Sequence, residues 1–402
     1  MKTNNRRDFL RKSMLGISGA ALMPSVLKSY PPAATLVPAP EIPFRTMGRT
    51  GIKTPLISFG TAGVTSPGLL KAAYEAGVRL FFSANYYGEG NNEMLVGDAL
   101  KNMPRESYFI GTASVPDGID MRTGLLPRSF TADSYMKKTE ASLKRFGIDY
   151  IDFVLLPYAG KKETVLNDAV LKTFEAVKKQ GKAKFVGIAS HGDTEEALNA
   201  AAGSGIYDVA MIAYNFKLQN PDSLNATISN AVKAGMGIVA MKSTAGAERQ
   251  KSGQPFNSDA ALKWVLQNMN ISSIVSGMTS LEELNKNLAM VQNLKMTSQE
   301  MKDLGIASLP STDGLYCRQC KQCLSQCPYN IDIPTMMRSY MYAYGYRNTE
   351  HAWYALSDAG IKGNPCNDCE SCKVNCSSGF DIKNKVTKIA RLSDIPKEFL
   401  HS

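Results

Sequence analysis

Cysteine is absent from the first 316 residues of this 402-residue chain, and all eight cysteines lie between Cys317 and Cys376. This distribution excludes a disulfide scaffold spread over the chain and indicates one cysteine-dependent module near the C-terminus. Long hydrophobic runs are also absent, because no stretch approaches about 20 consecutive apolar residues. With a mean hydropathy of -0.19, we exclude a polytopic membrane protein and expect no integral membrane segment in the mature chain.

Acidic residues are fewer than basic ones, which gives a formal net charge of +10. Part of this excess comes from residues 1–40, which hold six Lys or Arg and one acid, so the remaining 40 bases and 35 acids leave +5. No stripe of Lys and Arg with interleaved aromatics occurs, and we expect no nucleic-acid partner. Hydrophobic residues make up 44% of the chain and charged residues 20%, which is typical of a globular protein with a large core.

The N-terminal segment has the features of an export signal. An Arg-Arg pair at residues 6–7 is followed by Phe-Leu and a further base, which resembles the twin-arginine (Tat) signal of bacteria. The moderately apolar stretch at residues 14–27 is too short and too rich in small residues to span a membrane. An ordinary basic amphipathic helix is the alternative. We predict a Tat signal peptide and linker at residues 1–42, and a periplasmic location in a Gram-negative envelope.

Eight short apolar runs alternate with amphipathic helical patterns in the middle of the chain. The runs occupy residues 55–59, 78–84, 108–114, 151–158, 183–190, 209–215, 237–243 and 272–278. Helical patterns lie between them, for example at residues 135–146, 168–179, 224–234, 260–269 and 281–291. Eight such units in about 240 residues predict an α/β fold, a (β/α)8 (TIM) barrel. A doubly wound sheet is the alternative, but no Gly-x-Gly-x-x-Gly follows the first run.

Several segments of this region resemble aldo-keto reductases, in the order in which that family has them. Residues 44–53 and 57–62 resemble the opening hairpin and first strand, 77–84 and 87–93 the second-strand segment, 241–246 the end of the seventh strand, and 276–287 the cofactor segment. The resemblance implies an aldo-keto-reductase-like TIM barrel, which we place at residues 43–300.

The same resemblance implies an altered catalytic site. Aldo-keto reductases use a tetrad of Asp, Tyr, Lys and His, in which the Tyr delivers a proton to the carbonyl oxygen. Here only the Tyr is matched, by Tyr87, and the other three positions fall on Phe82, Ala113 and Pro157. Without a neighbouring Lys, a phenol with a pKa of about 10 is a poor acid at neutral pH. Tyr87 is therefore either a residual catalytic group or a hydroxyl left at the pocket mouth.

The cofactor segment is altered as well. By the resemblance, Gly277 and Glu283 occupy positions where members that prefer NADP place bases, and Asn287 matches the Asn that contacts adenine. The Glu283 carboxylate would repel a 2′-phosphate, so NAD is favoured over NADP. The alternative is that residues 281–291 are only the eighth barrel helix, with Asn287 on its solvated face. Binding of NAD(P) is one of these two open interpretations.

Polar side chains follow several predicted strands, at the end of a barrel where active sites form. His191 could act as a substitute acid or base near neutral pH, and Lys242 could bind an anion or phosphate. A hydrogen-bonded rim histidine and a solvated lysine are the alternatives. The catalytic candidates are Tyr87 and His191, and the cofactor-binding candidates are Asn215, Lys242, Gly277 and Asn287.

The cysteines form two copies of the pattern C-x2-C-x2-C-x3-C. The copies are Cys317, Cys320, Cys323 and Cys327, followed by Pro, and Cys366, Cys369, Cys372 and Cys376, followed by Ser. The pattern closely resembles bacterial ferredoxins with two [4Fe-4S] clusters, in which the fourth Cys of each motif binds the other cluster. The resemblance implies one cluster on Cys317, Cys320, Cys323 and Cys376, and a second on Cys366, Cys369, Cys372 and Cys327.

Zinc sites and disulfides are the alternatives for these cysteines, but zinc normally uses paired C-x2-C units. The spacer at residues 328–365 holds four tyrosines, at positions 340, 342, 344 and 346. We expect it to form an insert of one or two helices in which these tyrosines pack, with a redox role as the alternative. The predicted module is a small, mostly helical ferredoxin-type domain at residues 301–402.

These features together resemble the subset of aldo-keto reductases that carry a C-terminal iron–sulfur domain. They predict an exported oxidoreductase that passes electrons between two [4Fe-4S] clusters and a small-molecule substrate or redox partner protein at the barrel mouth. The alternatives are an NAD(P)-dependent carbonyl or sugar reductase, and a non-catalytic electron-transfer or scaffold subunit.

Overall fold

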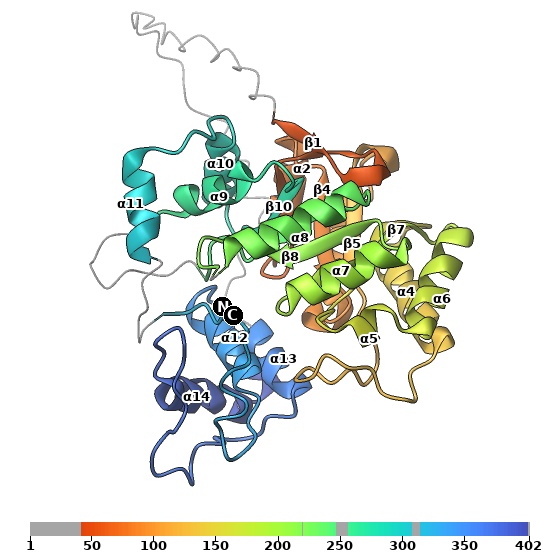
Figure 1. Ribbon diagram of the computed structural model, residues 1–402. Coiled ribbons are helices and arrows are strands. Elements are labelled where there is room, and N and C mark those ends of the chain that lie inside the picture. The colour runs from red at the N-terminus through yellow and green to blue at the C-terminus, as the bar shows by residue number, and fades with distance from the viewer. Residues whose placement is uncertain (1–41, 219, 247–255, 308–313, 401–402) are drawn as a thin grey trace, which may run out of the picture. The chain divides into compact units, whose positions relative to one another are not determined.

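The computed structural model describes residues 42–218, 220–246, 256–307 and 314–400 (Figure 1). The predicted Tat signal and linker lie outside these ranges, apart from Ile42. No helix in the described ranges is long and apolar enough to cross a membrane.

Eight parallel strands close into a barrel in the order β10-β3-β4-β5-β6-β7-β8-β9. The strands are β3 (Ile57–Gly60), β4 (Leu80–Ala84), β5 (Phe109–Ala113), β6 (Ile151–Leu156), β7 (Ala183–Ser190), β8 (Val209–Ala213), β9 (Gly237–Met241) and β10 (Ser273–Gly277). Each lies within one of the predicted apolar runs or overlaps it. The predicted TIM barrel is therefore confirmed.

Alternation along the strands divides the core into two layers. In β4, Phe81 packs outward among the residues under the helices, whereas Leu80 and Phe82 pack inside the barrel with Phe153. This follows from the two-residue period of a strand, and both faces are apolar because helices cover the outside. Met47, fully buried, enters the interior beyond the short hairpin of β1 (Phe44–Thr46) and β2 (Lys53–Pro55).

Helices follow the strands as a TIM barrel requires. They are α2 (Pro67–Glu75), α3 (Asn91–Leu100), α4 (Ala132–Phe146), α5 (Lys162–Val165), α6 (Asp168–Lys179), α7 (Thr194–Ser204), α8 (Pro221–Lys233), α9 (Ser258–Gln267) and α10 (Leu281–Met290). Their ends carry local signals: the Asn167 side chain accepts hydrogen bonds from Ala169 and Val170 at the start of α6, and Gly147 ends α4 with a φ of 67°.

The C-terminal region is helical between its cysteine loops. It contains α11 (Ser298–Ala307), α12 (Ile333–Tyr344), α13 (Thr349–Asp358) and α14 (Ile382–Ala390). Helices α12 and α13 confirm the expected insert between the two cysteine motifs. Helix α11 spans the boundary that we placed after residue 300. Its Glu300 pairs with Lys263 of barrel helix α9 at 2.8 Å, so the start of α11 packs on the barrel.

Helix α12 is buried on every side over ten consecutive residues, Ile333 to Tyr342. A helix that packs on one neighbour buries only a stripe of its surface. Here α12 contacts α13 and α14 within the C-terminal region, and its Tyr342 is hydrogen-bonded to Lys242 of the barrel. This helix therefore lies between the barrel and the rest of the cysteine region.

A buried ion pair joins α3, β5 and α4. Glu93, fully buried, accepts hydrogen bonds from Thr112 Oγ1 and Arg145 Nε, both at 2.6 Å. Glu93→Ala leaves Arg145 without its carboxylate, and we expect it to lower the free energy of unfolding by roughly 2–4 kcal/mol. Thermal unfolding followed by far-UV circular dichroism would measure this, with Glu75→Ala on the exposed face of α2 as the control. Equal midpoints for the two variants would contradict the prediction.

Candidate functional site

The eight cysteines form two groups of four. Each group contains three cysteines of one motif and the fourth cysteine of the other motif. The thiol of Cys317 interacts electrostatically with Cys320, Cys323 and Cys376. The thiol of Cys366 interacts with Cys369, Cys372 and Cys327. All eight are free thiols, so the disulfide alternative is not realised in this structure. The two groups coincide with the ligand sets that the ferredoxin resemblance implies.

These donor sets fit iron–sulfur clusters. Burial and the neighbouring thiols raise the pKa of Cys317 to about 12 and that of Cys323 to about 11, so the free groups are neutral at physiological pH. A bound metal would deprotonate them, because thiolates are the ligating form. Among the described residues, no three Cys, His, Asp or Glu side chains converge on a single metal ion. Four separated thiols suit the larger cubane instead.

Left-handed backbone shapes the loop of the first cysteine motif. Gln319 and Lys321 have φ values of 58° and 60°, so the backbone turns sharply between successive cysteines of the motif. Gln319 also lies directly against the barrel at Gly192, where an added Cβ would come within 2.8 Å of its side chain. Only glycine allows this close approach between the motif and the loop after β7.

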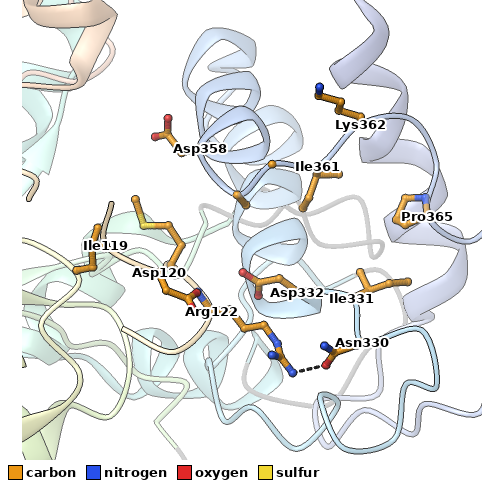
Figure 2. A pocket seen from close by; sticks show the side chains of 13 residues that line it. Ile119, Asp120, Arg122, Asn330, Ile331, Asp332, Asp358, Ile361, Lys362 and Pro365 are labelled. Carbon is orange, nitrogen blue, oxygen red and sulfur yellow. Dashed lines mark hydrogen bonds between the residues drawn. The ribbon is translucent and has the colours of Figure 1, made fainter. Parts of the chain in front are cut away.

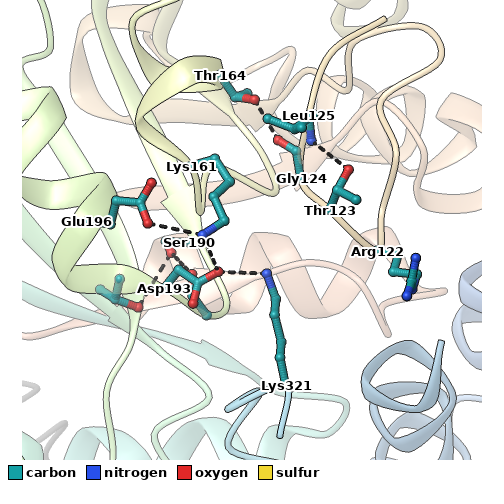
Figure 3. A network of polar contacts seen from close by, with 12 residues as sticks. Arg122, Thr123, Gly124, Leu125, Lys161, Thr164, Ser190, Asp193, Glu196 and Lys321 are labelled. Carbon is teal, nitrogen blue, oxygen red and sulfur yellow. Dashed lines mark hydrogen bonds and ion pairs between the residues drawn. The ribbon is translucent and has the colours of Figure 1, made fainter. Parts of the chain in front are cut away.

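An ion-pair network ties the same loop to the barrel (Figure 3). Lys321 Nζ lies 2.6 Å from Asp193 Oδ2, and Lys161 Nζ lies 3.6 Å from the same oxygen and 3.1 Å from Glu196 Oε2. Asp193 and Lys161 follow strands β7 and β6, so the network sits at the carboxyl-terminal end of the barrel. The cysteine region is therefore attached at the end of the barrel where active sites form.

An aromatic cluster fills the centre of this end of the barrel; we call it the mouth cluster. Its members are Tyr86, Tyr87, Tyr158 and His191 from barrel loops, and Tyr342 and His351 from α12 and α13. His351 lies 5.1 Å from Tyr87 and 4.1 Å from Tyr342 between ring centroids, edge to face in both cases. Tyr158 lies 6.0 Å from both Tyr86 and His191. The C-terminal region thus contributes directly to the surroundings of Tyr87.

The mouth cluster keeps its phenols and imidazoles neutral. Burial, with the neighbouring tyrosines, raises the pKa of Tyr87 above its ordinary value, and burial raises the pKa of Tyr158 to about 12. Burial, together with the charges of Lys242 and Arg338, lowers the pKa of His351 to about 3 and that of His191 well below its usual range. Neither His191 nor Tyr87 is therefore tuned toward neutral pH in this structure.

The positions matched to the other tetrad members carry no polar side chain. Phe82 lies inside the barrel, 6.1 Å from Phe153, and its ring occupies the space beside Gly111. Ala113 ends β5, and Pro157 follows β6, both buried. No acid, lysine or histidine from these positions faces Tyr87.

The candidate cofactor residues do not come together as one group. Asn215 is fully buried and donates to Lys242 O at 3.1 Å while it accepts from Lys217 N at 3.0 Å. Asn287 is also buried, not solvated, and donates to Ser276 Oγ at 3.0 Å. Gly277 is exposed at the end of β10. Lys242 Nζ instead donates to Tyr342 Oη of α12 at 3.1 Å.

Glu283 has a local structural role. Its carboxylate accepts hydrogen bonds from the backbone N–H of Thr279 at 2.7 Å and from Thr279 Oγ1 at 3.1 Å, at the start of α10. Ser280 Oγ in turn accepts from Glu283 N at 3.2 Å. This reciprocal capping explains a glutamate at this position without reference to a nucleotide.

A cleft of about 450 Å³ opens between a barrel loop and the cysteine region (Figure 2). It is bounded by residues 119–122 on the barrel side and by residues 330–332, 358–362 and 365 on the other, with Arg122 hydrogen-bonded to Asn330 across it. Its wall ends at Pro365, next to the buried Cys366. The cleft brings solvent close to the second group of cysteines.

Arg338 is the site residue that the sequence did not single out. It lies on α12 one turn before Tyr342, is 7% exposed, and its guanidinium carbon lies 5.5 Å from the centre of the Tyr158 ring. The i, i+4 spacing with Tyr342 was visible in the sequence. Nothing in the spacing shows that this face of α12 meets the barrel.

A TIM barrel whose mouth is covered by a region with two four-cysteine groups has the architecture of an iron–sulfur oxidoreductase. Residues 64–259 match the aldo/keto reductase family, and residues 316–381 match the 4Fe-4S dicluster domain. The chain therefore contains an aldo/keto reductase family domain followed by a 4Fe-4S dicluster domain.

Relatives agree with the barrel assignment. The chain is 22% identical over 306 residues to L-galactose dehydrogenase of Arabidopsis thaliana, covering 66% of this chain and 92% of that protein. It is 26% identical over 220 residues to D-threo-aldose 1-dehydrogenase of a Pseudomonas species, covering 47% and 66%. An aldo-keto reductase structure from Bacillus halodurans in its holo form superposes with a TM-score of 0.53 at 19% identity, covering 66% and 96%, and shows the shared fold.

The neutral His351 makes stability depend on pH. Its pKa falls from 6.5 in the unfolded chain to about 3 in the folded protein, so below pH 6.5 the unfolded chain binds the proton that the folded protein rejects. Stability is therefore complete above about pH 6.5 and declines as the pH falls toward 3. We expect His351→Asn to reduce the loss between pH 7 and pH 5 by on the order of 1–2 kcal/mol. Thermal unfolding at both pH values measures it, and Ser357→Ala on the exposed face of α13 should leave the decline unchanged.

Cys323 tests the cluster assignment. Cys323→Ala removes one of four ligands from the first group, and we expect a loss of about half of the bound iron, one cluster's share. Iron and acid-labile sulfide would be measured in protein purified without oxygen. Ser325→Ala, in the same loop but without a ligand atom for iron, is the control. An unchanged iron content in Cys323→Ala would refute the ligand set.

Proposed function

We propose that this protein is an exported iron–sulfur oxidoreductase that passes electrons between two [4Fe-4S] clusters and a substrate held at the barrel mouth. One observation carries the proposal. His351 of α13 packs against the ring of Tyr87, and Tyr342 of α12 packs against His351. Both helices lie between the two cysteine motifs. The cluster-bearing region and the pocket of the barrel therefore share side chains. A pocket built from both parts is expected where the two act in one reaction.

The eight cysteines would hold the clusters in the two groups described above. Bound [4Fe-4S] clusters supply single-electron transfer. Tyr316 precedes Cys317, is buried, and hydrogen-bonds to Asn215 after β8, so the chain beside the first group packs directly on the barrel. Buried packing of this kind excludes water and fixes the two redox partners relative to each other.

We also propose that the aldo/keto reductase tetrad is degenerate, with only Tyr87 kept. The apolar Phe82, Ala113 and Pro157 stand where the family has its acid, lysine and histidine. Tyr87 is buried among other phenols, and no cation of a lysine at position 113 lowers its pKa. These features favour a role for Tyr87 in positioning a substrate over proton transfer.

An NAD(P)-dependent carbonyl or sugar reductase is the second candidate. The names of two relatives favour it, since both are sugar dehydrogenases. Against it, the side-chain amides of Asn215 and Asn287 are hydrogen-bonded within the protein. Glu283 also places a carboxylate near the position expected for a 2′-phosphate. A non-catalytic electron-transfer or scaffold subunit is the third candidate, in which the mouth cluster would serve only as packing.

Export by the Tat pathway to a Gram-negative periplasm is part of the proposal and rests on the Arg-Arg pair at residues 6–7. Tat export carries folded proteins, which suits a protein whose clusters are inserted before it leaves the cytoplasm. Free nicotinamide cofactors are not maintained in a periplasm, so this location also favours electrons from the clusters over a soluble hydride donor.

Protein purified without oxygen from its own periplasm distinguishes the candidates. The protein would be denatured, its iron counted, and any released nucleotide identified by mass spectrometry. Iron for two clusters, no nucleotide, and turnover of a substrate with an artificial electron donor would support the proposal. Stoichiometric NAD or NADP would support the reductase instead. Iron without nucleotide or turnover, together with co-purification in a larger redox complex, would support the subunit.

Tyr87 gives a direct test of the tetrad. A carbonyl reductase that uses Tyr87 as its acid should lose at least about 100-fold in rate on Tyr87→Phe, because the variant lacks the one remaining acid, whereas a positioning role predicts a much smaller loss. Steady-state rates with NADH and with reduced methyl viologen would be compared, with the exposed Tyr344→Phe as the control. A retained rate in Tyr87→Phe would show that the phenol delivers no proton.

A further inference from the structure

The barrel mouth holds a buried arginine that forms no ion pair with a carboxylate of the described residues. Arg338 is 7% exposed, and its one hydrogen bond among the described residues goes from Nη2 to Thr335 Oγ1 at 3.2 Å. Its guanidinium faces the ring of Tyr158, which follows β6 at the mouth. A guanidinium has five N–H donors and is charged at every physiological pH, so most of its donors are available.

A second cation enters the same space from the barrel. Lys242 follows β9, and its Nζ lies 4.3 Å from the ring centre of Tyr342 and 5.3 Å from that of Tyr346. Its φ is 57°, a conformation that costs energy for a residue with a Cβ and that holds its side chain toward the mouth. Tyr158, beneath Arg338, also has a left-handed φ, of 56°.

The two charges act on the same groups. Both Lys242 and Arg338 lower the pKa of His191 and of His351, two members of the mouth cluster. The carboxylates whose charge reaches Arg338 are Asp332 and Asp358, and neither forms an ion pair with it in the described part of the chain. Asp332 instead caps α12, where it accepts from Thr335 N at 3.2 Å.

Arg338 is buried and Lys242 is half-buried, and in the described part of the chain neither forms an ion pair with a carboxylate. Loss of water around two cations is unfavourable, and contacts with aromatic rings offset only part of that cost. An anion placed between them would supply the missing counter-charge. The donors here are one planar fork and one ammonium, a combination that suits a carboxylate or a phosphate group.

We infer that the barrel mouth binds an anionic substrate, with its carboxylate or phosphate held between Arg338 of the cysteine region and Lys242 of the barrel. The inference deepens the proposed function and rests on it, because only the proposed function makes the bound anion a substrate. The rings of Tyr86, Tyr87 and Tyr158 then line the remainder of the molecule, and Tyr87 lies beside its reacting end. Because Arg338 belongs to α12, a barrel without the cysteine region lacks half of this site.

Calorimetric titration of the cluster-loaded protein with inorganic phosphate and with acetate, at constant ionic strength in chloride, tests the site. We expect at least one of the two anions to bind wild-type protein, and the stronger of them distinguishes a phosphate from a carboxylate site. Arg338→Gln should weaken that binding by roughly 10- to 100-fold. Lys242→Met should weaken it as well. Arg391→Gln, which removes an exposed charge from the same region, should leave it unchanged.

Iron content and circular dichroism confirm that each variant is folded, and Arg338→Lys provides a second variant that keeps the charge and should retain part of the affinity. Absence of anion binding to wild-type protein, or equal losses in Arg338→Gln and Arg391→Gln, would overturn the inference. Titration with NADH separates the sources. If Arg338→Gln weakens the binding of NADH as much as the binding of phosphate, the site recognises the phosphates of a nucleotide, and the substrate assignment is wrong.

These outcomes are independent of the test of the proposed function. Anion binding that depends on Arg338, in a protein without turnover from an artificial donor, would leave the site standing and remove the electron-transfer role. Turnover without anion binding would support the electron-transfer role and refute the anion site.

Discussion

The packing of α12 against the carboxyl-terminal ends of the barrel strands is the interaction on which the rest of the site depends. Ten consecutive buried residues make this helix part of two cores, one with α13 and α14 and one with the barrel. Because the helix cannot leave without exposing that surface, Arg338 and Tyr342 are fixed over the mouth. The mouth cluster is therefore formed by side chains from both the barrel and the C-terminal region.

This contact changes the chemistry available to the barrel. An open barrel mouth leaves phenols and imidazoles near water, with pKa values close to ordinary ones. Here the covering helices desolvate them, and Lys242 and Arg338 add positive charge, so the imidazoles of His191 and His351 lose their protons. The resulting mouth is positive and aromatic and has few groups that exchange protons at neutral pH. Such surroundings suit binding of an anion and electron transfer better than acid–base reduction of a carbonyl.

The same contact explains how the cysteine region is oriented. The loop of the first motif lies against Gly192 and pairs Lys321 with Asp193, while Cys327 and Cys376 each interact with cysteines of the other motif. Anchoring one motif therefore positions both. The wall of the cleft includes Pro365, the residue before Cys366.

The sequence alone predicted the barrel, because eight apolar runs alternating with helical patterns indicate a parallel sheet covered by helices, and no glycine-rich signature of the doubly wound alternative follows the first run. It also predicted the cysteine module, because the ligand spacing is local. Through the family resemblance it pointed to Tyr87 and implied that the usual partners of this residue are replaced. The tertiary structure decided what surrounds Tyr87. Arg338, Tyr342 and His351 all lie more than 250 positions after Tyr87 in the sequence, and their contacts with the barrel depend on which face of α12 meets it. That choice is set by shape and burial across two domains, which no local pattern encodes.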